Sequence, residues 1–364
     1  MEILTRIYRD IQFVFEFLEE VLEPLTDKQK KLIQTLELIQ IEKFIHNRID
    51  GFRGRPEKDR RAIARAFIAK AIYNLPTTRI LIDHLRGSPN LRRICGWERV
   101  SEVPSESLFS RVFAEFAEGH LPQKIHEALI KKYESPRLVG HISRDSTAIK
   151  AREKSSSKKK KKKKKSKYGK GRPRKGEIRE PKEQTRLERQ FSGMLLVDML
   201  SELPKSCDWG SKKNSGGKKE NWKGYKLHVD WADGGIPISC ILTSASVYDN
   251  QVAMPLAEMT YKQVTSLYDL MDAAYDADAI KKHSYRLGHI PIIAQNPRRG
   301  LKKEMEPASE IRYHERSVAE RGFGRLKDDL GALFVRVKGY AKVMAHLMFG
   351  ILVLSAEQLL RLVV

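Results

Sequence analysis

The stretch GYKLHVDWADGGIPISCILT, residues 224–243, contains two strand patterns joined by a turn. Gly224–Trp231 alternates apolar and polar side chains, and Ile236–Thr243 is mostly apolar, which favours β-strands over a helix. Asp233–Gly235 lies between them, and such Gly-rich pairs are typical of hairpin turns. The stretch therefore predicts an antiparallel hairpin.

Strand and helix patterns alternate on both sides of this hairpin. The expected strands are His141–Ile149, Val264–Met271 and Ile290–Ala294. The expected helices are Asp249–Tyr261, which Asp249 would cap, Ala277–Leu287, Ile311–Leu330 and Ala341–Leu362, the last apolar on most sides and therefore buried. The order of strand, hairpin, helix, strand, helix, strand and helix predicts an α/β fold, a ribonuclease-H-like mixed sheet flanked by helices.

The first third of the chain contains only helical patterns, so we expect an all-α N-terminal domain over residues 1–135 and a ribonuclease-H-like catalytic domain over 136–364. Breaks such as residues 51–56 separate short helices with tight turns, as in helix-turn-helix bundles. Such a domain serves either DNA binding or dimerisation and packing. The expected helices are Ile11–Val21, Lys28–Ile45, Arg60–Asn74, Arg79–Leu85, Leu91–Cys95 and Ser105–Phe116.

Positive charge is concentrated in one segment. The chain has 364 residues and a net charge of +23, and Arg152–Arg189 alone holds nineteen Lys or Arg against five Asp or Glu. We expect a basic low-complexity insert at about residues 150–222, disordered or loosely ordered over Lys150–Arg189, with order returning at Trp222. Its lysine run, Lys158 to Lys165, and Arg172 in a Gly-Arg-Pro sequence favour contact with DNA phosphates and the minor groove, although a solvated tether is the alternative.

Composition bounds the remaining possibilities. Hydrophobic residues make up 41% of the chain, enough for a substantial core, and the three cysteines form no metal or disulfide pattern. No signal-peptide pattern opens the sequence, and the apolar run Val343–Leu354 is too short to span a membrane. We therefore expect a cytoplasmic protein that binds a polyanion rather than a membrane.

Three acids lie where the predicted fold would bring them together. Asp145 is inside the first strand, Asp272 follows a later strand directly, and Glu320 is on the helix after the last strand. The first and fourth strands are expected to be neighbours at the centre of the sheet, with the helix crossing beside them. Converging carboxylates repel one another and need a cation, and hard oxygen ligands suit Mg²⁺ or Mn²⁺. Capping of strand ends is the simpler interpretation of each aspartate alone.

The helix that carries Glu320 is also basic. Tyr313, Glu320 and Lys327 are spaced by seven residues, and Arg316 lies four residues before Glu320, so they share one helix face. This face is either a solvated surface with an Arg316–Glu320 ion pair or a phosphate-binding face beside the metal. A basic loop containing Arg298 and Arg299 precedes the helix and adds two candidate DNA contacts.

These residues resemble the DDE transposases of bacterial insertion sequences. Tyr313, Arg316, Glu320 and Lys327 match the family's Y-(2)-R-(3)-E-(6)-K signature without a gap, and residues 222–250 and 54–117 are also similar to the family. The resemblance implies Asp145, Asp272 and Glu320 as catalytic, Mg²⁺- or Mn²⁺-binding acids. It also implies cleavage of terminal inverted repeats and their joining to target DNA, by a homodimer in the bacterial nucleoid.

Two features depart from this family. The insert of about seventy residues is long, and only 48 residues separate Asp272 from Glu320, which leaves no room for the β insertion domain of some relatives. Two other functions remain open on sequence alone. One is a catalytically silent, basic DNA-binding protein derived from a transposase, and the other is a nuclease of the same fold that only hydrolyses DNA.

Overall fold

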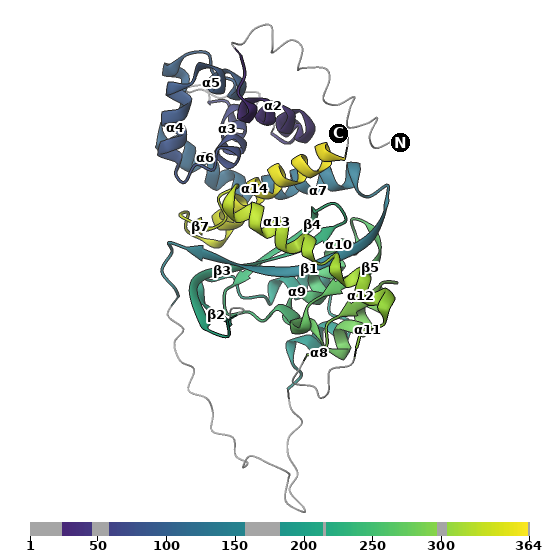
Figure 1. Ribbon diagram of the computed structural model, residues 1–364. Helices are drawn as coiled ribbons and strands as arrows, with labels where there is room; N and C mark the ends of the chain where they lie inside the picture. The colour runs from purple at the N-terminus through teal and green to yellow at the C-terminus, as the bar shows by residue number, and fades with distance from the viewer. Residues whose placement is uncertain (1–23, 46–57, 157–182, 214–215, 297–303, 363–364) are drawn as a thin grey trace, which may run out of the picture.

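The computed structural model describes residues 24–45, 58–156, 183–213, 216–296 and 304–362. It has a mixed β-sheet in the lower half of Figure 1 and a group of helices above it. The helix predicted at residues 11–21 and the break at residues 51–56 lie outside the described residues.

A seven-stranded mixed sheet forms the second part of the chain, as the order of elements predicts. Strand β1 lies at its centre, antiparallel to β3 and parallel to β5. The order is β2-β3-β1-β5-β6, with β4 paired to β3 and β7 paired to β1. The strands are β1 Leu138–Ala151, β2 Asp208–Lys213, β3 Lys219–Ala232, β4 Ile236–Ser244, β5 Thr265–Met271, β6 Ile290–Ile293 and β7 Phe334–Val335.

The hairpin expected at residues 224–243 is present as β3 and β4. Gly234 and Gly235 both have φ of 79°, a backbone conformation that side chains with a Cβ rarely adopt. Strand β4 is buried at every position because it is covered on both faces, by α14 and by α10. This covering explains why its sequence is continuously apolar rather than alternating.

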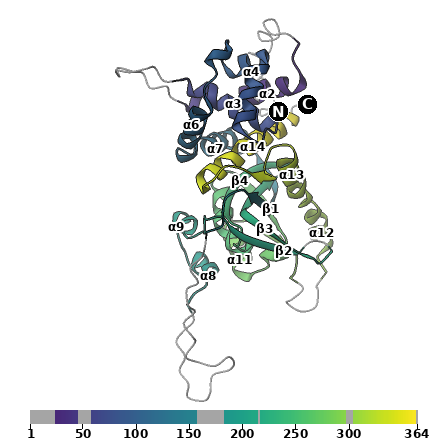
Figure 2. The same ribbon diagram turned by 90° about the vertical axis from the view of Figure 1, so that its left-hand side faces the viewer.

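Helices cover both faces of the sheet. Helices α13 (Ser317–Asp328) and α14 (Tyr340–Arg361) pack on one face, and α10 (Ala253–Tyr261) packs on the other. Figure 2 shows α12 and α13 on one side of the sheet, with α8 and α9 on the opposite side. The other helices of this half are α8 Arg186–Phe191, α9 Leu196–Ser201, α11 Asp278–Arg286 and α12 Pro307–His314.

The helical N-terminal region is also present. Thr77 caps α4 by accepting a hydrogen bond from the N–H of Ile80. Helix α7, which directly precedes β1, was not predicted from the sequence. The helices are α2 Asp27–Ile39, α3 Arg60–Ile72, α4 Thr78–Gly87, α5 Pro89–Cys95, α6 Glu106–Glu118 and α7 Leu121–Tyr133.

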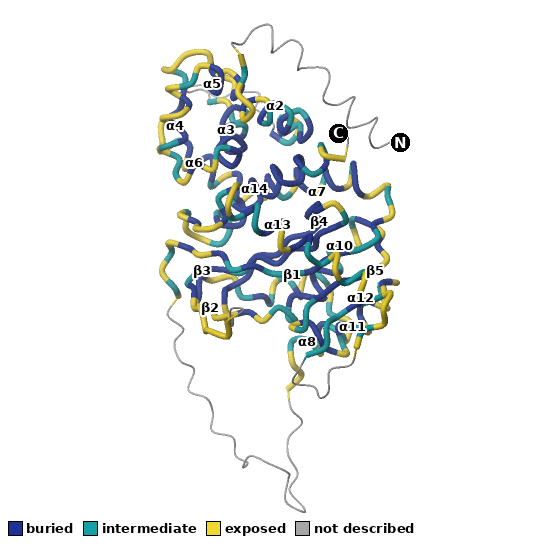
Figure 3. The backbone as a smooth tube through the Cα atoms, in the orientation of Figure 1, coloured by how far each residue is buried: buried dark blue, intermediate teal, exposed yellow. Residues whose placement is uncertain are grey.

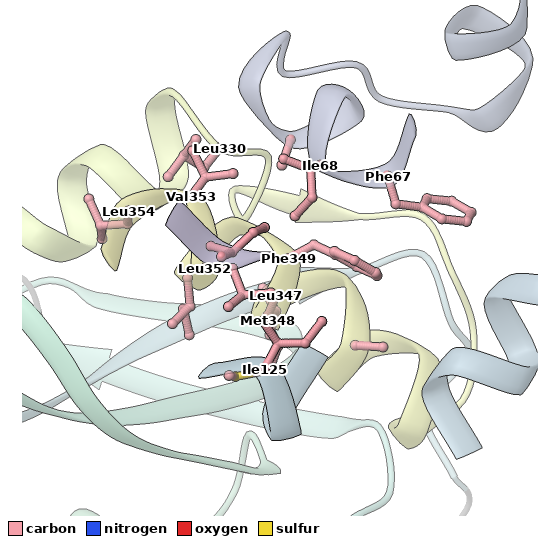
Figure 4. Close-up of a cluster of buried hydrophobic side chains, with 14 of the residues drawn as sticks. Phe67, Ile68, Ile125, Leu330, Leu347, Met348, Phe349, Leu352, Val353 and Leu354 are labelled. Atoms are coloured by element: carbon pink, nitrogen blue, oxygen red, sulfur yellow. The ribbon is translucent and has the colours of Figure 1, made fainter. Parts of the chain in front are cut away.

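Helix α14 lies between the sheet and the N-terminal helices (Figures 1 and 3). It packs against α7, α3, α6 and β4, and one hydrophobic cluster extends from α2 through α14 to the sheet. Phe349 of α14 stacks with Phe67 of α3 at 5.6 Å between ring centroids, and both are labelled in Figure 4. The predicted burial of the closing helix is confirmed. It is the one described helix long and apolar enough to cross a membrane, and 83% of its apolar window is buried inside the fold.

Three sequence predictions about elements are wrong in detail. Helix α2 ends at Ile39 rather than Ile45, because Gln40 turns into the left-handed conformation at φ 46°. Order begins before Trp222, since α8, α9 and β2 lie upstream of it. Thr185 starts α8 with a capping box to Glu188, a signal hidden inside the basic segment. Within Lys150–Arg189, Lys150 also belongs to β1.

The stretch Ile311–Leu330 is not one continuous helix. Helix α12 ends at His314 and α13 begins at Ser317, with Arg316 between them as the N-cap residue of α13. A face defined by steps of seven residues therefore does not extend unbroken from Tyr313 to Lys327. The positions of these side chains are set by how the two helices pack on the sheet.

Candidate active site

The two aspartates lie side by side at the centre of the sheet. In the parallel β1–β5 pair, Arg144 is opposite Met271, so Asp145 and Asp272 occupy the next positions along the two strands. Asp272 follows β5 directly and accepts a hydrogen bond from the N–H of Ala274 at 2.9 Å. The prediction that the first and fourth strands are central neighbours is confirmed.

Arg316 joins Glu320 to Asp145. Its Nη1 lies 3.3 Å from Asp145 Oδ2, and its Nη2 lies 3.1 Å from Glu320 Oε1. The guanidinium also lies 5.8 Å from the centroid of the Tyr313 ring. One cation thus contacts two of the three predicted acids. The break between α12 and α13 places Arg316 where it can reach the sheet.

The environment makes the two aspartates hard to ionise. Burial raises the pKa of Asp145 to about 6, with Asp272 and Asp249 adding repulsion, while the Ser146 N–H and Arg316 oppose the rise. Burial also raises the pKa of Asp272 against the Ala274 N–H and Arg316. Burial opposes the charge on Arg316, yet the acids around it raise its pKa. A divalent cation would relieve the same repulsion more fully than one guanidinium does.

The three carboxylates are suitable ligands for a hard cation, but they do not form a ready metal-binding cluster. Among the described residues, no three His, Cys, Asp or Glu side chains form a group that could hold a metal ion. Arg316 accounts for this arrangement, because it lies between Asp145 and Glu320 and contacts both. The carboxylate oxygens of Asp145, Asp272 and Glu320 are nevertheless the ligand type that Mg²⁺ and Mn²⁺ prefer.

Lys327 lies further along α13, on a basic edge. Burial lowers the pKa of its ammonium, and repulsion from Lys212 and Lys150 adds to the effect, although Asp328 and Asp145 oppose it. Lys212 is on β2 and Lys150 is at the end of β1, so three elements contribute cations here. An anion at this edge would be attracted by all three.

Comparison with known protein families identifies the fold. The family described as Transposase DDE domain matches residues 191–355, and the family described as Transposase domain (DUF772) matches residues 17–115. The chain belongs to the DDE transposases. Searches of curated proteins and of solved structures gave no significant match.

The two matches together cover most of the transposase, and they divide its candidate residues unevenly. The DDE match includes Asp272 and all four signature residues, but it begins after Asp145. The link between Asp145 and the matched region is therefore structural. It consists of the β1–β5 pairing and the contact with Arg316.

A buried charge network under the candidate site was not predicted from the sequence. Arg144 donates two hydrogen bonds to Asp230, at 2.8 and 2.7 Å, and lies 3.9 Å from Asp269. Burial opposes the charge on Arg144, but the two acids outweigh it and raise its pKa. The sequence signal that could have revealed it is the presence of Arg144, Asp230 and Asp269 inside strands, since buried charges require partners. This network holds β1, β3 and β5 together on the face opposite Asp145.

Asp249 was predicted to cap a helix, and that prediction is wrong. Asp249 begins a short 3₁₀ helix, Asp249–Gln251, and its carboxylate accepts hydrogen bonds from Ser146 at 2.7 Å and from Lys226 at 3.1 Å. Helix α10 starts only at Ala253. Asp249 is thus a fourth acid beside Asp145. It is paired with Lys226, which was not predicted from the sequence.

Several predicted DNA-binding residues lie outside the described residues of the transposase. They are Lys158, Lys165, Arg172, Arg298 and Arg299. Their proposed contact with DNA rests on sequence alone. The described candidates are Tyr313 and Arg316, beside Asp145, and Lys327 further along α13.

Proposed function

We propose that this transposase cleaves the ends of an insertion sequence and joins them to target DNA by divalent-metal-dependent phosphoryl transfer. The observation that carries the proposal is the arrangement around Arg316. Asp145 and Asp272 are neighbours across the β1–β5 pair, and the guanidinium of Arg316 contacts both Asp145 and Glu320. Three acids from distant parts of the chain thus meet around one positive charge.

In this proposal Asp145, Asp272 and Glu320 hold Mg²⁺ or Mn²⁺. When bound, the metal ions activate water or a 3′-hydroxyl and stabilise the leaving oxygen of the phosphodiester. Arg316 is then released from the carboxylates and binds phosphate oxygens through two N–H groups, while Lys327 contributes a point charge. Tyr313, beside Arg316, donates a hydrogen bond or stacks near the scissile phosphate.

The other parts of the chain position the DNA. We assign residues 1–135 to end recognition or dimerisation, and residues 136–364 to catalysis. The basic residues Lys158, Lys165, Arg172, Arg298 and Arg299 contact the phosphate backbone without reading sequence. Two element ends must be brought together, which favours a homodimer on double-stranded DNA in the bacterial cytoplasm.

The test is cleavage of DNA that carries the inverted repeats flanking this reading frame. Purified protein with Mg²⁺ or Mn²⁺ should nick the repeat ends and transfer them to a supercoiled plasmid. Asp145→Asn, Asp272→Asn and Glu320→Gln should each abolish both products while DNA binding persists. The matched control is Asp198→Asn, an exposed acid on α9, which should retain full activity.

Each alternative function has its own outcome in this assay. Undiminished cleavage by Glu320→Gln would refute the assignment of the third acid. Hydrolysis without any strand transfer would identify a nuclease. Tight binding without cleavage in either metal would identify a DNA-binding protein that has lost its chemistry.

A further inference from the structure

A cleft lies between the N-terminal helices and the segment that leads into α14. Its volume is about 300 Å³. Phe67, Phe113 and Phe349 form an apolar wall, and Phe67 and Phe349 are labelled in Figure 4. The rest of the described lining contains hydroxyl groups, from Thr78 and Ser110, and a set of basic side chains, namely Lys70, Arg336, Lys338, Lys342 and His346.

Lys70 is the unusual member of this lining. It lies in the last turn of α3 and is only 8% exposed. Within the described part of the chain, no carboxylate forms an ion pair with it, and burial lowers the pKa of its ammonium to about 8. A buried charge without a partner is costly, so proteins usually pair it with an acid or a bound ion.

His346 does not serve as that partner. Its Nε2 lies 3.1 Å from the carbonyl oxygen of Gly331, and an N–H there would donate to that oxygen. Burial and the nearby Lys70 lower the pKa of His346 to about 3, so the ring is neutral at physiological pH. No Asp or Glu is among the described residues that line the cleft. The cleft therefore concentrates positive charge that nothing in its lining neutralises.

We propose that this cleft binds the phosphate group of a nucleotide, with Lys70 as the central cation. A phosphate carries close to two negative charges and several strong acceptor oxygens, which suits Lys70 with Arg336, Lys338 and Lys342 around it. A single carboxylate would leave most of this positive charge unmatched. The phenylalanine wall takes the apolar surface of the sugar and base.

Two neighbouring cavities indicate where the nucleotide comes from. One shares Lys70, Arg336 and His346 with the cleft and adds Phe334. The next shares Phe334 and adds Lys150, Arg152, Lys223 and the exposed Trp209. Lys150 lies five positions after Asp145 on β1.

The cavities thus form a basic path with aromatic side chains from the cleft to the end of β1, the strand that also carries Asp145. Such a combination of cations and aromatic rings suits a nucleic-acid strand. A DNA strand, which carries one negative charge on each successive phosphate and so places several along this path, is one source of the ligand, and a free nucleotide with a terminal phosphate is the other. The DNA source rests on the proposed function, whereas phosphate binding itself does not.

The experiment measures thermal unfolding of the full chain in metal-free buffer with increasing phosphate, against chloride at matched ionic strength. The arms are inorganic phosphate, deoxyadenosine monophosphate and a short single-stranded oligonucleotide. Wild-type protein should show saturable stabilisation by phosphate and by the monophosphate. Lys70→Met should weaken this binding by about 10- to 100-fold, the range for losing a hydrogen bond to a charged group.

Two further variants, Arg336→Gln and Lys124→Met, separate effects on binding from effects on folding. Lys70→Met should unfold at a higher temperature than wild type without phosphate, because it removes an unpaired buried charge. Arg336→Gln, an exposed member of the lining, should weaken phosphate binding without that gain. Lys124→Met on α7, an exposed lysine away from the cleft, should bind phosphate as wild type does.

The outcomes are distinct. No saturable stabilisation by any ligand, or equal stabilisation of Lys70→Met and wild type, overturns the proposal. Lys70-dependent stabilisation by the oligonucleotide supports the DNA source, and its restriction to phosphate and the monophosphate supports a free nucleotide. Phosphate binding with no DNA cleavage in any metal would reject the proposed function and leave this site standing.

Discussion

Two arginines lie between carboxylates on opposite faces of the same sheet, and they differ in almost every other respect. Arg144 is 1% exposed and donates two hydrogen bonds to Asp230, at 2.8 and 2.7 Å. Arg316 is 18% exposed and makes one longer contact each with Asp145 and Glu320, at 3.3 and 3.1 Å. Asp230 also accepts from Thr260, and Asp269 from Ser284, so the buried group has several further partners.

The difference separates a structural ion network from one that can be exchanged. Burial makes the Arg144 network costly to open, since every charge in it would lose its partner far from water. Arg316 and Asp145 are partly exposed, at 18% and 19% of their side chains, and Glu320 has 65% of its side chain exposed. In the proposed mechanism, the acids that contact Arg316 exchange its guanidinium for a metal ion. Because Arg144 and Asp145 are adjacent on β1, the rigid network also fixes the strand that carries the first acid.

The largest expected effect comes from breaking the buried network. Arg144→Met should lower the free energy of unfolding by about 3–5 kcal/mol, because Asp230 and Asp269 would be left as buried charges without their cation. Urea denaturation at neutral pH measures this loss. Arg111→Met, at an exposed arginine on α6, is the control and should change stability by less than about 0.5 kcal/mol. Equal losses in the two variants would contradict the structural role.

The second effect is a pH dependence on the other face. Because the pKa of Asp145 is raised from 3.8 to about 6, the folded state holds its proton more tightly than the unfolded chain does. Stability therefore falls as pH rises from about 4 to 6, by about 2–3 kcal/mol at ~1.4 kcal/mol per pKa unit. Urea denaturation with a chelator present measures it.

Asp145→Asn provides the control, because an amide does not titrate. The variant should lose this part of the pH dependence, and saturating Mg²⁺ should reduce it in wild type by favouring the ionised carboxylate. An unchanged pH profile in Asp145→Asn would show that the buried acids elsewhere, and not Asp145, control stability in this range.

A third effect concerns how α13 is seated on the sheet. A Cβ added to Gly322 would lie 2.4 Å from the ring of Trp231, so Gly322→Ala should cost about 1–3 kcal/mol through overpacking. It should also reduce DNA cleavage, since α13 carries Glu320. Gly324→Ala on the same helix meets nothing within 4 Å and should stabilise by up to about 1 kcal/mol. If both variants stabilise the protein, close packing of α13 on Trp231 is not required.

The smallest change in stability is expected for Arg316 itself. Arg316→Gln should alter the free energy of unfolding by less than about 1 kcal/mol, because its contacts are long and one partner is well exposed. DNA cleavage should nevertheless be lost, since a phosphate contact is removed. A loss of stability as large as that of Arg144→Met would contradict the claim that Arg316, unlike Arg144, contributes little to folding.

Sequence patterns located most of the regular elements, because apolar periodicity and turn residues act locally. The β3–β4 hairpin, the central β1–β5 neighbours and the buried closing helix were all predicted. Elements inside biased or polar sequence were missed, such as α8 and β2. Their stability comes from capping and strand pairing rather than from composition. Arg316 was predicted on a continuous helix, and the break before α13 was not visible in the charge pattern.

By itself, the sequence determined the spacing of Tyr313, Arg316, Glu320 and Lys327, because side-chain identity is a property of the chain. Local periodicity likewise placed Asp145 within a strand and Asp272 directly after one. Only the tertiary structure decided which charges meet. It buried Arg144 with Asp230 and Asp269, paired Asp249 with Lys226, and left Lys70 without an acidic partner among the described residues. Such pairings depend on register and on which face each strand presents, and these are set by packing between segments far apart in the chain.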